Sequence, residues 1–168
     1  FELFSLSPSF QLDLQGLAQS YRELQQQYHP DNFAANNDDN QAAVMQKAAQ
    51  INDAYQTLKN PVTRAEYMLS EQGHDIRGEQ TTMQDPVFLM QQMELREELE
   101  SLPSSSDPES ALFDFAENVS VMRKEQLGLL QQQLESEIWQ EAAQSVRKLK
   151  FIDKLNHEVE QLEDKLLG

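Results

Sequence analysis

The sequence has 168 residues, no cysteine, and a formal charge of −16 at pH 7 from 29 acidic side chains against 13 Lys and Arg. This length suits one medium domain or two small ones, and the missing cysteines exclude disulfides, thiolate zinc sites, cysteine nucleophiles and direct thiolate ligation of an iron-sulfur cluster. The negative charge argues against nucleic acid as a partner, because phosphates need a surface rich in Lys and Arg.

The first half of the chain shows a helix–loop–helix pattern. Asp13 is predicted to cap a helix that runs to about Tyr28, and a second helix is predicted from about Gln41 to Leu58. A shorter helix, 62–71, should end before Gly73. The inward-facing residues are predicted from three- and four-residue spacings: Leu14, Leu17, Tyr21, Leu24 and Tyr28 in the first helix, and Val44, Ala48, Ile51, Ala54, Tyr55 and Leu58 in the second.

The two long helices are separated by His29-Pro30-Asp31. Proline disfavours the helical conformation in the residue before it, so the first helix should stop near Tyr28 and leave His29 and Asp31 on a connecting loop. For an isolated tripeptide, a simple helix stop and turn is the commoner explanation. An enzymatic acid–base pair is disfavoured, because the sequence lacks a phosphate loop, a nucleophile motif and a metal-ligand cluster.

Residues 74–84 show no sustained periodicity, and we place a linker there between residues 1–73 and 85–168. Asp85-Pro86 predicts a helix start, with the helix reaching about Leu102. Its inward stripe is Phe88, Leu95, Leu99 and Leu102. A second apolar group falls on another side, beside acidic residues, and is either buried in a bundle or an exposed patch for a partner: Leu89, Met90 and Met93.

Two more helices complete the second half. Asp107-Pro108 starts a helix to about Glu135, and the last helix should run from about Glu137 to Leu166. Phe151 lies off the apolar stripe of this last helix, next to basic residues, and is either a partner contact or a packed neighbour. The predicted fold is therefore all-α, with an antiparallel helix hairpin and short flanking helices followed by an antiparallel three-helix bundle.

Two groups of residues carry a family resemblance. His29-Pro30-Asp31, followed by Ala54-Tyr55-x-x-Leu58-x-Asn60-Pro61-x-x-Arg64-Ala65-x-Tyr67, resembles the J domain of DnaJ-type co-chaperones. The acidic second half and the run Val146 to Leu155 are similar to the HscB family, the J-type co-chaperones of bacterial iron-sulfur cluster assembly. The resemblance covers nearly the whole chain.

The resemblance implies two partners and no cofactor. An HscA- or DnaK-type ATPase chaperone would be bound and activated through His29, Pro30, Asp31 and Arg22. An IscU-type iron-sulfur scaffold protein would be bound by the bundle, at Leu89, Met90, Met93, Glu94, Glu97 and Phe151. The chain departs from common J domains in having Gln25-Gln26-Gln27 and Asn32 where basic residues are usual, which favours a dedicated chaperone.

The alternative function is a general J protein that presents unfolded polypeptides to a DnaK-type chaperone. No stretch approaches the ~20 apolar residues that span a bilayer, and the amino terminus lacks a basic region followed by an apolar one. We therefore expect a cytoplasmic protein that does not bind a membrane. Residues 79–168 hold 19 acids and 8 bases, so this half should prefer a basic partner surface.

Overall fold

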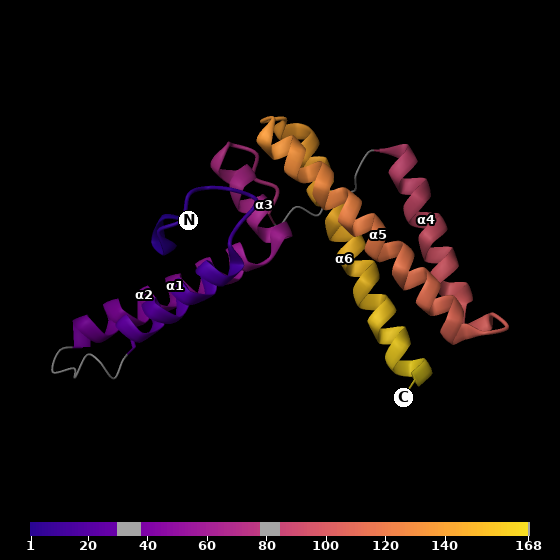
Figure 1. Ribbon diagram of the computed structural model, residues 1–168, viewed down its shortest axis with the longest axis horizontal. Helices are drawn as coiled ribbons and strands as arrows, with labels where there is room; N and C mark the ends of the chain where they lie inside the picture. Colours follow the sequence, from indigo (N-terminus) through magenta and orange to yellow (C-terminus); the bar gives the residue numbers. More distant parts are fainter. Residues whose placement is uncertain (30–37, 78–84, 168) are drawn as a thin grey trace. The chain divides into compact units, whose positions relative to one another are not determined.

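Helices form all the regular structure in residues 1–29, 38–77 and 85–167, which are the residues that the computed structural model describes (Figure 1). The chain divides into two units, Phe1–Asp75 and Ile76–Gly168. Each unit builds its own core, in agreement with the predicted all-α class. Within the described residues, no helix combines the length and the apolar character needed to cross a membrane.

The first unit is a helical hairpin with short flanking helices. A 3₁₀ turn, η1 (Glu2–Phe4), precedes α1 (Leu14–Gln27), α2 (Asp38–Lys59) and α3 (Pro61–Glu71), and α1 and α2 lie side by side (Figure 1). The core joins η1, α1 and α2 through Phe4, Leu17, Ile51 and Leu58. The carboxylate of Asp13 accepts hydrogen bonds from the backbone N–H groups of Gln15 and Gly16, as expected of an N-cap.

Two predictions for this unit need correction. Helix α2 begins at Asp38, three residues before the predicted start. Leu14 is half-exposed and not inward-facing. At ~100° per residue it sits about 60° away from Leu17 around the helix, at the edge of the buried stripe.

A buried arginine ties the amino-terminal segment to α3. The Nε of Arg64 donates to the Leu58 carbonyl oxygen at 2.9 Å, its Nη1 donates to the Phe10 carbonyl oxygen, and its guanidinium lies 5.5 Å from the centre of the Phe10 ring. Burial lowers the pKa of Arg64. This side chain holds the segment before α1 in place and so supports the base of the hairpin.

The second unit is a three-helix bundle. Helix α4 (Pro86–Ser101) is followed by a 3₁₀ turn, η3 (Leu102–Ser104), and then by α5 (Pro108–Glu135) and α6 (Trp139–Leu167), which run antiparallel (Figure 1). The predicted inward stripe of α4 is confirmed: Phe88, Leu99 and Leu102 are buried, and Leu95 packs against the core. The rest of this core comes from α5 and α6: Leu112, Phe115, Val119, Ile152, Leu155 and Val159.

The start of α6 differs from the prediction. The helix begins at Trp139, two residues after the predicted Glu137, because Glu137 has a φ of 58° and so lies in the left-handed region. Its backbone N–H donates to the Leu134 carbonyl oxygen at 3.2 Å, and the N–H of Ile138 donates to the Gln133 carbonyl oxygen at 2.9 Å. These two bonds form a Schellman motif that ends α5.

Candidate functional site

The free end of the α1–α2 hairpin carries the first candidate site. Helix α1 ends at Gln27, and the N–H of Tyr28 donates to the Leu24 carbonyl oxygen at 3.0 Å. Further along the hairpin, the rings of Tyr21 and Tyr55 stack at 3.9 Å, and the Tyr21 hydroxyl donates to Asn52 Oδ1 at 2.9 Å. The loop therefore leaves a rigid pair of helices whose relative register is fixed by side-chain contacts.

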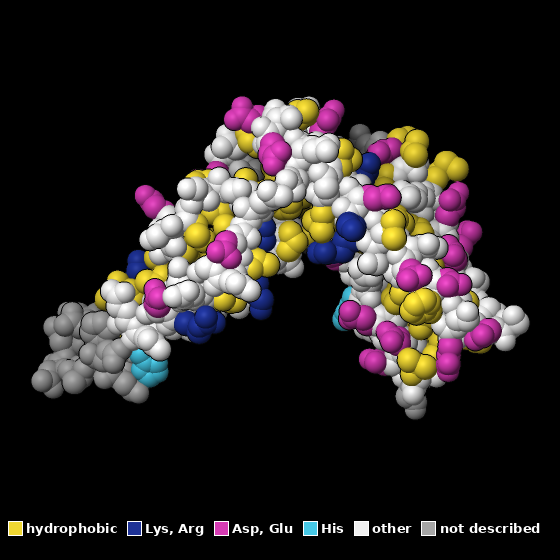
Figure 2. All heavy atoms as spheres, viewed as in Figure 1, with side chains coloured by type: hydrophobic (Ala, Val, Ile, Leu, Met, Phe, Trp, Pro, Cys, Tyr) yellow, Lys and Arg dark blue, Asp and Glu magenta, His cyan; other side chains and the backbone are white. Residues whose placement is uncertain are grey.

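The predicted residues of this site are only partly covered by the structure. Both His29 and Arg22 are exposed; Arg22 lies on α1, and His29 follows the end of that helix, where its N–H donates to the Gln26 carbonyl oxygen at 3.5 Å. Pro30 and Asp31 lie outside the described residues. Figure 2 shows Lys and Arg side chains gathered on one flank of this unit.

The second candidate site lies on α4. Met90 and Met93 are 63% and 65% exposed, Glu94 and Glu97 are also exposed, and Leu89 is half-buried. Of the two alternatives for this apolar group, burial in the bundle is therefore wrong for both methionines. Along α4, Figure 2 shows hydrophobic side chains alternating with acidic ones.

Phe151 belongs to the packing between α4 and α6. It is half-buried, its ring meets that of Phe88 edge-on at 5.7 Å, and the guanidinium of Arg96 lies 5.5 Å from its centre. Arg96 is itself fixed by Glu158 on α6, with Nη1 2.9 Å from Oε2. The structure thus places Phe151 partly inside the α4–α6 junction, as a packed neighbour whose remaining surface is open to solvent.

Two models of known protein families match the two halves of the chain. A model described as "DnaJ domain" matches residues 2–67, and a model described as "HSCB C-terminal oligomerisation domain" matches residues 84–160. The co-chaperone protein HscB homolog of Aliivibrio salmonicida is 76% identical over 168 residues, which is 100% of this chain and 98% of the relative. The chain belongs to the HscB family.

Solved structures of this family share the fold. The chaperone HscB from Vibrio cholerae has 52% sequence identity and a TM-score of 0.89, over 99% of this chain and 98% of that one. Human co-chaperone protein HscB has 25% identity and a TM-score of 0.88, over 97% and 81%. The hairpin unit is thus a J domain, and the chain is a J-type co-chaperone of iron-sulfur cluster assembly, from a family whose members regulate partner ATPases and are not themselves enzymes.

Two surface residues near these candidate sites were not predicted from the sequence. Lys47 on α2 has its Nζ 5.9 Å from the centre of the Tyr28 ring, so it adds positive charge near the end of the hairpin. Val87 is 77% exposed, and its spacing from Met90 and Glu94 puts it on the same side of α4. Periodicity could have found Val87, whereas Lys47 comes next to Tyr28 only through the tertiary pairing of α1 with α2.

The part of the chain that the structure describes contains no group of three or more His, Asp or Glu side chains placed to hold a metal ion. The backbone of His74, which follows α3, has a structural role. The N–H of His74 donates to the Leu69 carbonyl oxygen at 2.8 Å, which completes the end of α3 after Gly73.

Proposed function

We propose that this HscB-family chain stimulates ATP hydrolysis by an HscA- or DnaK-type chaperone and delivers an IscU-type iron-sulfur scaffold protein to it, which promotes cluster transfer. The observation that carries the proposal is the pair of exposed methionines on α4. This helix already buries Phe88 and Leu99 and packs the partly buried Leu95 against the core, so the bundle does not need Met90 or Met93 for its core. An exposed apolar group of this kind is typical of a protein-binding surface.

The end of the hairpin contacts the chaperone in this proposal. In this proposal Asp31 makes the charged contact, Pro30 stiffens the turn, His29 is a donor or packing group, and Arg22 adds positive charge. Lys47 extends this charge onto α2. The loop can raise the rate of hydrolysis only by contacting the hydrolysis-competent arrangement of the chaperone better than the resting one.

The scaffold is bound by Leu89, Met90, Met93, Glu94, Glu97 and Phe151. Methionine is flexible and polarizable, so a surface with two exposed methionines can adapt to a folded partner. The two glutamates favour a basic rim on that partner and disfavour acidic competitors. Phe151 adds the open edge of an aromatic ring that Phe88 and Arg96 hold in one orientation.

The chaperone contact is tested by Asp31→Asn, which removes the charge and keeps the size of the side chain. We expect stimulation of the partner chaperone to fall at least tenfold in a single-turnover ATPase assay, while binding to the scaffold protein is unchanged. Asp39→Asn, which removes a charge from the first turn of α2, is the matched control. Undiminished stimulation by Asp31→Asn would disprove the assignment.

The scaffold contact is tested by Met90→Ser combined with Met93→Ser. Both positions are exposed, so the fold should persist, and we expect at least a tenfold loss of affinity for the purified scaffold protein in calorimetric titration. Met45→Ser on α2, where the methionine is 66% exposed, is the control and should bind normally. A denatured peptide that competes as well as the folded scaffold would favour the general J-protein alternative instead.

A further inference from the structure

The bundle has a second apolar surface that the proposed function does not use. A groove lies between the first turns of α5 and the last turns of α6. Its floor is formed by the core residues Leu112 and Val159, and its walls by Phe113 and Leu167, which are 62% and 61% exposed. A phenylalanine this exposed on a helix that already buries Phe115 contributes little to the core, so its position calls for another explanation.

The size of the groove favours a protein segment over a small molecule. Its volume is about 250 Å³, below the roughly 300–1,000 Å³ typical of ligand pockets. Such a space accepts one or two apolar side chains from a helix laid along it, as in other helix-in-groove complexes. The two walls come from different helices, so an inserted side chain would contact both at once.

The acidic residues around the groove favour a partner segment with basic side chains. Glu109 and Glu163 are the charged residues that line it. Residues 107–117 contain four acids, residues 157–167 contain four acids and one lysine, and the net charge of these two stretches is therefore −7 of the −16 for the whole chain. Figure 2 shows hydrophobic side chains ringed by acidic ones over the start of α5 and the end of α6.

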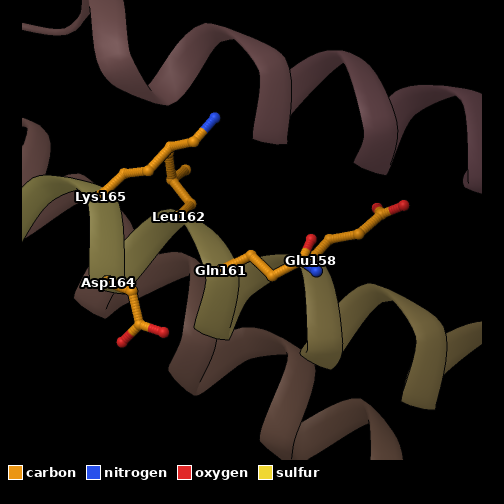
Figure 3. A pocket seen from close by; sticks show the side chains of 5 residues that line it. All are labelled: Glu158, Gln161, Leu162, Asp164 and Lys165. Atoms are coloured by element: carbon orange, nitrogen blue, oxygen red, sulfur yellow. The ribbon is translucent and has the colours of Figure 1, made fainter.

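Lys165 does not neutralise the glutamates of the groove. Figure 3 shows a neighbouring hollow on α6, in which Lys165 lies on the side of Leu162 while Asp164 points the opposite way. Glu163 and Lys165 are two residues apart and so face away from each other on the helix. All the charged residues that line the groove are therefore carboxylates.

We propose that this groove docks a cationic amphipathic helix of a partner protein, with one or two large apolar side chains inserted between Phe113 and Leu167 and basic residues facing Glu109 and Glu163. A second copy of the chain is disfavoured because two molecules of −16 repel each other. An anionic membrane or a nucleic acid is disfavoured for the same reason. This surface is separate from Met90 and Met93, so it leaves the scaffold contact available.

The test uses the full chain and a fluorescein-labelled 18-residue peptide, with Leu on one face of the helix and Lys on the other. We expect the peptide to bind in fluorescence anisotropy, with affinity falling as salt is raised. Phe113→Ser with Leu167→Ser should weaken binding at least tenfold. Glu109→Gln with Glu163→Gln should weaken it several-fold and reduce the salt dependence.

Matched controls separate the groove from the general acidity of the bundle. Val121→Ser with Leu129→Ser removes two other exposed apolar side chains of α5, and Met90→Ser with Met93→Ser alters the α4 surface. Both pairs should bind the peptide as the unchanged chain does. Equal losses in groove and control variants would overturn the proposal, as would a concentration-dependent dimer that Phe113→Ser abolishes, because the occupant would then be a second copy.

Discussion

Glu137 occupies a backbone position that normally belongs to glycine. It follows Ser136, the C-cap of α5, and has a φ of 58°. Gly73 has the equivalent position after Gln72, the C-cap of α3, with a φ of 81°. Both helices end in the same pair of hydrogen bonds, from Gly73 and His74 in one case and from Glu137 and Ile138 in the other. A residue with a Cβ pays a steric cost in this conformation and glycine does not.

The matched pair of substitutions at these positions should have opposite effects on stability. Glu137→Gly should raise the free energy of unfolding by about 0.5–1 kcal/mol, and Gly73→Ala should lower it by about 1 kcal/mol. No atom lies within 4 Å of a Cβ added at Gly73, so its loss would reflect backbone strain alone. Urea denaturation of the full chain measures both changes, and a destabilised Glu137→Gly variant would contradict the argument.

At the scale of the helices, local sequence signals predict the structure correctly. Asp85 and Asp107 cap α4 and α5 as predicted, and their side chains accept hydrogen bonds from backbone N–H groups of the first turn. The exposed methionines were separated from the buried stripe of α4 by angular position alone. The left-handed Glu137 was missed, because neither its residue type nor its spacing marks such a conformation.

Polar residues inside the bundle were missed for a different reason. Ser145 is 2% exposed and Gln133 is 9% exposed, and the Ser145 hydroxyl donates to Gln133 Oε1 at 2.5 Å. Gln126 in turn donates to the Ser145 hydroxyl at 2.8 Å. A rule that puts apolar residues inside cannot find this link, since Ser145 and Gln133 are acceptable in the interior only when each has its hydrogen-bond partner.

This link between α5 and α6 should behave as one unit. Ser145→Ala leaves the Gln133 side chain buried without its donor, and we expect it to lower the free energy of unfolding by about 1–3 kcal/mol. Ser145→Ala combined with Gln133→Leu should be less destabilised than the single variant, because the buried Gln133 amide is then no longer left without its donor. Thermal denaturation followed by circular dichroism compares the two, and additive losses would show that the link is not cooperative.

At the scale of the whole molecule, the proposed function depends on having both sites on one chain. Joining a chaperone contact to a scaffold contact turns the second binding event into an intramolecular one, and this can raise the overall affinity by about 10²–10⁴. The two surfaces belong to different units, each with its own core. Substitution of one surface should therefore leave the other intact.

A complementation experiment tests whether this linkage is used. One full-length chain carries Asp31→Asn and keeps only the scaffold contact, and another carries Met90→Ser with Met93→Ser and keeps only the chaperone contact. An equimolar mixture contains every contact but on separate molecules, so we expect scaffold-dependent stimulation of the chaperone ATPase to stay at least about tenfold below that of the unchanged chain. In the control, each variant is mixed with the unchanged chain, which shows whether the variant inhibits the activity of the unchanged chain. If the mixture reached the rate of the unchanged chain, the two contacts would act independently, and scaffold delivery would not require a single adaptor.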